Sequence, residues 1–266
     1  MTASHHVLLI GGHGKVAQLL TPLLLKRSWT VTSMIRAREQ APTIQKLGNG
    51  LPGKLNVLIS SVAEVSSKDH AASILADVKP DYIAWSAGAG GKGGPEATFR
   101  IDRDAAIHFI RAAADLPSIT RFLLVSYTGS RRASASWWPA GEWDEYDAKV
   151  NHGILATYYQ AKLAADEALY ETCQKSPTLV GICLRPATLT EETAGKVELG
   201  KTAHVKGSVS RATVAATADA LLASSGIKNS WLDLQDGDED LHVAVKRVIK
   251  DGVDAAEGET IFGRTT

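Results

Sequence analysis

The sequence has few of the residues on which several classes of protein depend. It contains two cysteines in 266 residues, Cys173 and Cys183, without the spacing of a disulfide framework. Both are expected to be reduced packing residues in a reducing compartment. The eight histidines show no ligand spacing beyond the adjacent first pair, so no metal site is expected.

The sequence also lacks an excess of positive or negative charge, and it lacks long apolar runs. The 29 Lys and Arg residues balance the 29 Asp and Glu residues, so nothing favours nucleic acid or an anionic membrane as a partner. No apolar run approaches the length of a membrane span, and no cleavable signal sequence is expected. We therefore expect a cytoplasmic protein, monomeric or homodimeric, that acts on a small molecule.

Short apolar runs rich in β-branched residues and leucine recur along the chain. They span residues 7–10, 30–35, 56–59, 82–85, 122–125, 179–184 and 231–234. Helical apolar spacing lies between several of them, at residues 15–26, 97–114 and 154–170. Strands that alternate with helices predict a Rossmann-type α/β fold, a doubly wound parallel sheet with helices on both faces. We expect one domain over residues 1–266.

Two segments interrupt this alternation. Residues 128–152 are long for a connection in a compact domain and hold three tryptophans. They form either an ordered surface excursion or a wall of the substrate pocket. Residues 188–210 alternate polar residues with glycines and resemble a small hairpin or loop. We expect that both segments are insertions and that they form the substrate side of the domain.

A glycine cluster follows the first apolar run. The pattern is Gly11-x-x-Gly14-x-x-Ala17, with Gly12 as a third glycine, and an amphipathic stretch follows at once. The amino end of such a helix suits a phosphate, and glycines let a pyrophosphate approach the backbone. The loop predicts a dinucleotide site, and a glycine-rich turn that binds nothing is the alternative. The predicted contacts are Gly11, Gly12, His13, Gly14, Lys15 and Val16.

Arg36 directly follows the second apolar run, and Arg38 lies two residues later. At this position a carboxylate accepts a hydrogen bond from the 2′-hydroxyl of NAD, whereas an arginine suits the 2′-phosphate of NADP. A guanidinium pairs with phosphate in a bidentate manner. The sequence therefore favours NADP(H) over NAD(H), against the alternative of two solvated arginines.

Small residues end the next two runs. Ser60 and Ser61 follow the third run, where the adenine is expected to lie. Ser86, Ala87 and Gly88 follow the fourth run, where small side chains let the backbone approach the cofactor. We expect all five residues to contact the cofactor.

Tyr158 and Lys162 lie four residues apart in a helical pattern, so both project from one face of that helix. A nearby ammonium favours a phenolate and is expected to lower the pKa of the phenol. The pair can then exchange a proton with a carbonyl or alcohol oxygen that Ser126, at the end of the fifth run, polarises. Ser126, Tyr158 and Lys162 are therefore the predicted catalytic residues, against the alternative of an aromatic side chain that packs beside a solvated lysine.

In this order the motifs resemble those of the short-chain dehydrogenases/reductases. The matching residues are Gly11-Gly12-His13-Gly14, Arg36, Ser86-Ala87-Gly88, Ser126, Tyr158 with Lys162, and Arg185-Pro186-Ala187. The sequence is most similar to the atypical branch of NAD(P)-binding, NmrA-like and flavin-reductase-like proteins, in an uncharacterised fungal and bacterial subgroup. The resemblance implies that Lys162, Arg185, Pro186 and Ala187 also bind the cofactor.

Three departures accompany the resemblance. Ala17 replaces the third glycine of the loop, and Ala187 replaces the usual glycine after Arg-Pro. Ser126 and Tyr158 also lie farther apart along the chain than is typical of the superfamily. The extra length is the tryptophan-rich segment, so the sequence leaves open whether the two side chains meet.

These motifs predict an NADP(H)-dependent oxidoreductase. It would transfer a hydride between the nicotinamide and a small carbonyl, quinone-like or activated-alkene substrate. One alternative is a non-catalytic NADP(H)-binding redox sensor of the NmrA-like type, which would bind a protein partner. The other alternative is a flavin- or biliverdin-type reductase that does not need the tyrosine.

Overall fold

The main sheet is mostly parallel. The computed structural model describes residues 4–91 and 93–263, and in them the strand order is β3-β2-β1-β4-β5-β6-β10-β8. The strands are β1 (His6–Ile10), β2 (Thr30–Ile35), β3 (Lys54–Ile59), β4 (Tyr82–Trp85), β5 (Arg121–Val125), β6 (Val180–Pro186), β8 (Val197–Gly200) and β10 (Ser230–Asp236). Neighbours pair in parallel except β8, which is antiparallel to β10. The predicted doubly wound sheet is confirmed.

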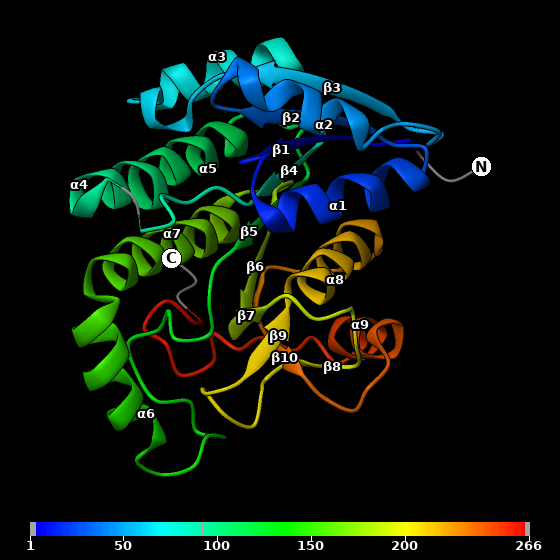
Figure 1. Ribbon diagram of the computed structural model, residues 1–266. Helices are drawn as coiled ribbons and strands as arrows, with labels where there is room; N and C mark the ends of the chain where they lie inside the picture. Colours follow the sequence, from blue (N-terminus) through cyan, green and yellow to red (C-terminus); the bar gives the residue numbers. More distant parts are fainter. Residues whose placement is uncertain (1–3, 92, 264–266) are drawn as a thin grey trace.

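Helices cover both faces of this sheet (Figure 1). The longer ones are α1 (Lys15–Lys26), α3 (Lys68–Val78), α5 (Ala106–Ala114), α7 (Ala156–Lys175), α8 (Arg211–Ala223) and α9 (Leu241–Lys250). Val7 and Leu9 of β1 share a core with α1, α8 and α9, whereas Leu8 and Ile10 share the opposite core with α3, α5 and α7. Because both faces of β1 are buried, its sequence is apolar throughout.

Short helical segments precede or bend the longer helices. They are η1 (Arg38–Gln40), α2 (Ala41–Lys46), η2 (Val62–Glu64), α4 (Gly94–Thr98), η3 (Phe99–Ala105), α6 (Glu142–Tyr146) and η4 (Asp147–Ile154). The segments η3 and η4 are π-helical and join α4 to α5 and α6 to α7. Such widened turns often occur at functional sites. The helix predicted at residues 97–114 is therefore part of a longer helical segment that begins at Gly94, and the helix predicted at residues 154–170 follows a kink at Gly153.

The segment at residues 188–210, expected as a hairpin or loop, has a different arrangement. Its strands β7 (Thr188–Thr190) and β9 (Ser208–Ser210) pair with each other in parallel, which a hairpin does not allow. Between them the chain crosses to the main sheet, where β8 pairs with β10. The sequence could not distinguish these cases, because alternating polarity fits either kind of pairing.

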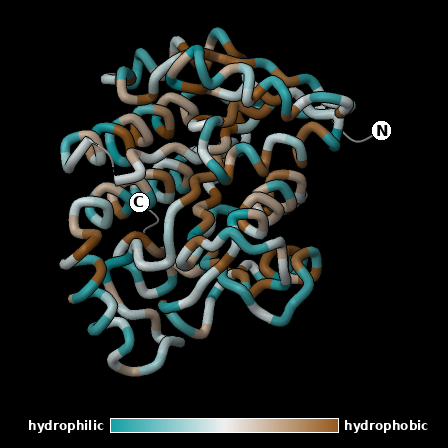
Figure 2. The backbone as a smooth tube through the Cα atoms, in the orientation of Figure 1, coloured by the Kyte–Doolittle hydropathy of each residue, from teal (hydrophilic) through white to brown (hydrophobic). Residues whose placement is uncertain are grey.

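The arrangement of the strands predicts where a ligand binds. Hydrophobic stretches gather along the central strands, and hydrophilic stretches lie along the outer turns (Figure 2). The strand order reverses beside β1, which lies between β2 and β4. Ligands of doubly wound sheets bind at the carboxyl ends of the strands at such a point.

No helix in the described ranges is long and apolar enough to cross a membrane.

Candidate functional site

A cleft of about 290 Å³ lies at the carboxyl ends of β1, β2, β3 and β4, and we call it the cleft. The residues of the predicted cofactor set that line it are Gly11, His13, Gly14, Arg36, Ser60, Ser61, Ser86, Ala87 and Gly88. Each group directly follows one of the four strands. Because parallel strands end at the same edge of a sheet, the topology brings these groups together.

Glycines let the chain turn closely at the end of β1. Gly11 has a φ of +83°, and a Cβ at this position would lie 2.6 Å from the Cα of Ala87. The amide of Gly14 donates to the carbonyl of Gly11 at 2.8 Å. A Cβ on Gly12 would overlap the Oγ of Ser33. Gly12 therefore packs against β2 and does not line the cleft, although it was predicted to contact the cofactor.

Arg36 supplies an unpaired positive charge at the edge of the cleft. Its side chain is exposed, and its backbone amide donates to the Oε1 of Gln40 at 3.2 Å. None of the ion pairs among the described residues involves Arg36 or Arg38. Arg38 lies in η1 and does not line the cleft. The glycine cradle and the free guanidinium of Arg36 fit a dinucleotide with an additional phosphate.

The two residues after the glycine loop point away from the cleft. The Nζ of Lys15 pairs with the Oε1 of Glu191 at 2.6 Å on the surface. Val16 is buried in the core that α1 shares with β1. Neither side chain lines the cleft, so the structure does not group them with the other predicted cofactor contacts.

The cleft also contains residues that the sequence prediction missed. They are Met34, Ile35, Gln40, Val62, Ala63 and Ile101. Val62 and Ala63 directly follow Ser61 in the turn η2, so their place after the third strand was a usable signal. Ile101 reaches the cleft from η3, and its apolar spacing in the sequence predicts an ordinary helix and not a π-helical turn.

A second pocket of about 460 Å³, which we call the pocket, lies at the ends of β5 and β6. Among the predicted site residues, those that line it are Ser126, Tyr158, Pro186 and Ala187. Both insertions contribute as well, with Tyr146 from the first and Val205 from the second. Pro186 and Ala187 therefore line the pocket and not the cleft, although the resemblance implied that they bind the cofactor with the cleft residues.

The two insertions are bound to each other. The indole Nε1 of Trp138 donates to the carbonyl of Thr202 at 2.8 Å. The Oε1 of Glu142 accepts from the amide of Val205 at 3.0 Å. Trp138 stacks on Trp143 with ring centroids 5.7 Å apart, and both belong to a small separate hydrophobic cluster. The two segments therefore form one wall of the pocket.

Ser126 and Tyr158 line the same pocket despite the long segment between them. The Oγ of Ser126 donates to the Oδ2 of Asp166 at 2.6 Å. The Nζ of Lys162 donates to the carbonyl of Val125 at 2.8 Å, and the lysine side chain is buried. The structure thus brings the predicted serine and tyrosine together and places Lys162 outside the lining of both cavities.

The electrostatics around Tyr158 differ from the prediction. Burial raises the pKa of the Tyr158 phenol, and the carboxylates of Asp102 and Asp166 raise it further. The pKa of Tyr158 is therefore raised and not lowered as expected, and Lys162 is not among the groups that shift it. Burial also raises the pKa of both carboxyl groups, and the Lys162 ammonium opposes that rise. Lys162 thus compensates two buried acids instead of activating the phenol.

These two acids were missed by the sequence prediction. Asp166 lies four residues after Lys162 on the same helix, so helical spacing was an available signal. Asp102 comes from η3, and its Oδ2 accepts from the amide of Ala89 at 2.9 Å. Only the folded chain shows that Asp102 lies close enough to Lys162 and Tyr158 to influence them.

Arg185 is a structural residue in this fold. Its side chain is 0% exposed, and its Nε lies 3.0 Å from the Oδ1 of Asp233, which is equally buried. Its guanidinium lies 4.2 Å from the ring centroid of Trp231, and its Nη2 donates to the carbonyl of Thr128 at 2.6 Å. The role in cofactor binding implied by the resemblance does not fit this position.

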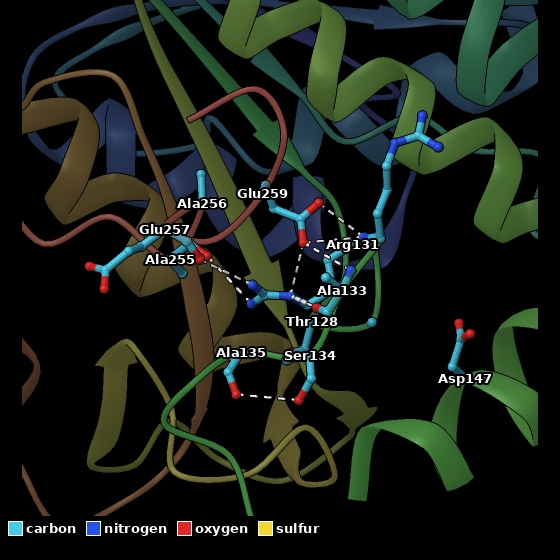
Figure 3. A network of polar contacts seen from close by, with 12 residues as sticks. Thr128, Arg131, Ala133, Ser134, Ala135, Asp147, Ala255, Ala256, Glu257 and Glu259 are labelled. Carbon is cyan, nitrogen blue, oxygen red and sulfur yellow. Dashed lines mark hydrogen bonds and ion pairs between the residues drawn. The ribbon is translucent and has the colours of Figure 1, made fainter. Parts of the chain in front are cut away.

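Residues 255–259 near the C-terminus bind the start of the first insertion (Figure 3). The Nη1 and Nη2 of Arg131 donate to the carbonyls of Ala255 and Glu257 at 3.4 Å. The carboxylate of Glu259 lies 3.3 Å from the Arg131 Nε and accepts from the amide of Ala133 at 3.2 Å. Burial lowers the pKa of Arg131 to about 10, which leaves it charged at neutral pH. These contacts support the chain that borders the pocket.

Metal ligands and reactive thiols are not evident at either cavity. In the described part of the chain, no group of three or more His, Cys, Asp or Glu side chains could hold a metal ion. Cys173 and Cys183 are both buried and free. Burial raises the pKa of the Cys173 thiol to about 12, so this side chain is a protonated thiol at neutral pH.

Comparison with known proteins gives consistent matches. A family model described as NAD(P)H-binding matches residues 11–225. A UPF0659 protein of Schizosaccharomyces pombe is 30% identical over 246 residues, which cover 91% of this chain and 94% of that protein. The uncharacterised sugar epimerase YhfK of Bacillus subtilis is 29% identical over 244 residues, which cover 91% of this chain and 99% of that protein.

Solved structures agree with these matches. A Bacillus halodurans protein assigned to the NAD-dependent epimerases/dehydratases has a TM-score of 0.71 at 26% identity, covering 92% of this chain and all 100% of that one. ChuY, an anaerobillin reductase from Escherichia coli O157:H7, has a TM-score of 0.65 at 22% identity, covering 88% of this chain and 98% of that one. The latter similarity concerns the fold alone.

Proposed function

The chain belongs to the NAD(P)H-binding family, as the resemblance to atypical short-chain dehydrogenases/reductases predicted, and we propose that it is an NADPH-dependent reductase. One observation carries the proposal: Arg36 stands at the end of β2, at the edge of the cleft, with its guanidinium free of acidic partners in the described residues. In this fold that position meets the adenosine ribose.

The charge at this position favours NADPH over NADH. A guanidinium gains a bidentate, charge-assisted interaction with a 2′-phosphate, and it gains much less from a 2′-hydroxyl. None of the residues that line the cleft is an acid that would repel the phosphate. Ser60 and Ser61 add hydroxyl groups at the end of β3, where the adenosine half of the ligand is expected.

The state of Tyr158 favours reduction over oxidation. When bound, NADPH supplies a hydride for the substrate. The raised pKa keeps the Tyr158 phenol protonated at neutral pH, so its hydroxyl donates a hydrogen bond to a substrate oxygen and does not serve as a base. Ser126 already donates to Asp166, so its oxygen is an acceptor at the pocket. The relative YhfK is named as a sugar epimerase, and any reaction that needs this tyrosine to remove a proton fits its raised pKa less well.

A flavin- or biliverdin-type reductase is a second candidate, favoured by the same raised pKa. A phenol with a raised pKa is a poor general acid, and these reactions do not require the tyrosine to act as a general acid. In that case Tyr158 shapes the pocket, and the proton comes from water.

The proposal is tested by following NADPH absorbance with aromatic aldehydes, quinones and flavins as substrates. We expect aldehyde reduction in the wild type and a decrease of about 10-fold or more in Tyr158→Phe, in line with the loss of one proton-transfer or hydrogen-bonding group. Tyr159→Phe is the matched control, because Tyr159 donates to the carbonyl of Arg131 and does not line the pocket.

Three outcomes separate the candidate functions. Loss of aldehyde reduction in Tyr158→Phe but not in Tyr159→Phe supports the proposal. Flavin reduction that is equal in the wild type and Tyr158→Phe, without aldehyde reduction, supports the second candidate. Tight NADPH binding with no turnover of any substrate contradicts both and favours a redox sensor.

A further inference from the structure

The lining of the pocket contains two cations and no carboxylate among its described residues. Lys206 and Arg211 both line it, and none of its described lining residues is acidic. Their partners lie outside the lining: the Lys206 Nζ is 2.7 Å from Glu145, and the Arg211 Nη1 is 3.0 Å from Glu191. Exposed ion pairs of this kind are weak. They orient the two cations without removing their attraction for an anion.

Arg211 has donors that are still available to a ligand. Its side chain is 23% exposed, and its contacts in the described chain all involve Nη1, which also donates to the carbonyl of Thr190 at 3.1 Å. Its backbone is fixed at the start of α8, where the Oγ of Ser210 accepts from the amide of Thr213 at 2.9 Å. The N–H groups on Nε and Nη2 therefore remain for a planar acceptor such as a carboxylate.

Three tyrosines line the same space. They are Tyr127, Tyr146 and Tyr158, and the rings of Tyr127 and Tyr158 have centroids 5.3 Å apart. Burial raises the pKa of all three phenols, so the rings are neutral and do not repel an anion. Flat aromatic walls pack well against a planar, conjugated ligand.

We propose that the substrate is a planar, conjugated aldehyde or ketone with a carboxylate that Arg211 and Lys206 bind, so that its carbonyl lies beside Tyr158. This assignment rests on the proposed reductase function. The carbonyl carbon gains a hydride from NADPH, the carbonyl π pair moves to the oxygen that the Tyr158 hydroxyl hydrogen-bonds, and that oxygen takes up a proton from solvent water. The products are a hydroxy acid and NADP⁺. A volume of about 460 Å³ suits a small aromatic acid.

The test compares 4-carboxybenzaldehyde with its methyl ester, which keeps the ring and the aldehyde but has no charge. Calorimetry measures the binding of each to the full chain, with and without NADP⁺, and NADPH absorbance measures their reduction. We expect the acid to bind about 10-fold more tightly than the ester, the effect of one charge-assisted contact. Arg211→Gln should abolish this preference and change ester binding less than about two-fold.

Glu191→Gln is the matched control, because it removes the acidic partner of Arg211 and leaves the lining of the pocket unchanged. It should preserve the preference for the acid. Lys206→Met alters an exposed side chain and should weaken acid binding by about three-fold, within the range of exposed ion pairs. This second variant keeps the proposal testable if Arg211→Gln is unstable.

The outcomes distinguish the substrate proposal from the reductase proposal. Equal binding of acid and ester by the wild type, or an equal loss of both in Arg211→Gln, overturns the carboxylate site. Reduction of the ester as efficient as that of the acid overturns it too but leaves the reductase function standing. Selective binding of the acid that depends on Arg211, without reduction of any aldehyde, supports the carboxylate site and overturns the reductase function.

Discussion

The cleft and the pocket are built in different ways. At the cleft, backbone lies against backbone, because Gly11 lets β1 pass close to Ala87, and Arg36 is left exposed and unpaired among the described residues. Behind the pocket, Arg185 and Asp233 are fully buried and face each other. The buried, paired Arg185 supports the chain, whereas the guanidinium of Arg36 at the edge of the cleft is available to a ligand. From the sequence both arginines are predicted to bind the cofactor, Arg36 from its place after the second apolar run and Arg185 from the family resemblance, and their surroundings in the fold distinguish them.

The largest predicted effect comes from removing the buried cation. Arg185→Met leaves Asp233 buried without its nearest partner and should lower the free energy of unfolding by about 3–5 kcal/mol. Arg36→Met makes the same chemical change at an exposed site and should alter it by no more than about 0.5 kcal/mol. Urea unfolding of both variants measures the difference. Similar losses of stability in the two variants would refute the contrast between support and ligand binding.

The buried pair also predicts a dependence of stability on pH. Burial raises the pKa of Asp233 to about 6, although Arg185 and Arg131 oppose the rise. In the unfolded chain an aspartate titrates near pH 3.9, so the folded protein holds this proton more tightly. The stabilisation is complete below about pH 4 and is lost as the pH rises through about 6, which amounts to about 3 kcal/mol.

This pH dependence is measured as the free energy of unfolding in urea between about pH 4 and pH 7. Asp233→Asn cannot titrate, so its stability should fall less steeply over this range than that of the wild type. Parallel curves for the two proteins would mean that Asp233 has an ordinary pKa. The comparison of slopes remains valid even if the variant is less stable at every pH.

A further loss of stability is predicted where the cleft depends on close backbone contact. Gly11→Ala introduces a Cβ 2.6 Å from the Ala87 Cα at a φ of +83°. Gly50 has a similar φ of +73° but nothing within 4 Å of its Cβ position, so Gly50→Ala measures the conformational cost alone. We expect a loss of about 1 kcal/mol at Gly50 and about 1–3 kcal/mol more at Gly11, both measured by urea unfolding. Equal losses would show that the close approach at Ala87 is not required.

The sequence identified the cleft better than the pocket, for a physical reason. Gly11, Arg36 and Ser86 each directly follow a strand, and a parallel sheet brings such positions to one edge whatever the details of packing. The direction in which the Arg185 side chain points depends on the register of β6 with β10. The setting of Lys162 depends on Asp102, which is distant along the chain. Local patterns contain neither kind of information.

For a related reason, the sequence did not predict the strand pairing of the second insertion. Alternating polarity indicated short strands at residues 188–210, but it did not indicate the partner of each strand. The parallel pairing of β7 with β9, and the position of β8 beside β10, arise only after the main sheet has formed. Lys206 and Arg211 reach the pocket through this arrangement, so their role could not be predicted from their neighbours in the sequence.

The central claim is that the unpaired Arg36 in the cleft binds the phosphate that distinguishes NADPH from NADH. It is tested most directly by paired titration of NADPH and NADH into the wild type, Arg36→Gln and Arg111→Gln, where Arg111 is an exposed arginine on α5 that does not line the cleft. We predict that the wild type and Arg111→Gln bind NADPH about 10-fold or more tightly than NADH, and that Arg36→Gln binds the two equally. NADH binding as tight as NADPH binding in the wild type, or an unchanged preference in Arg36→Gln, would contradict the account.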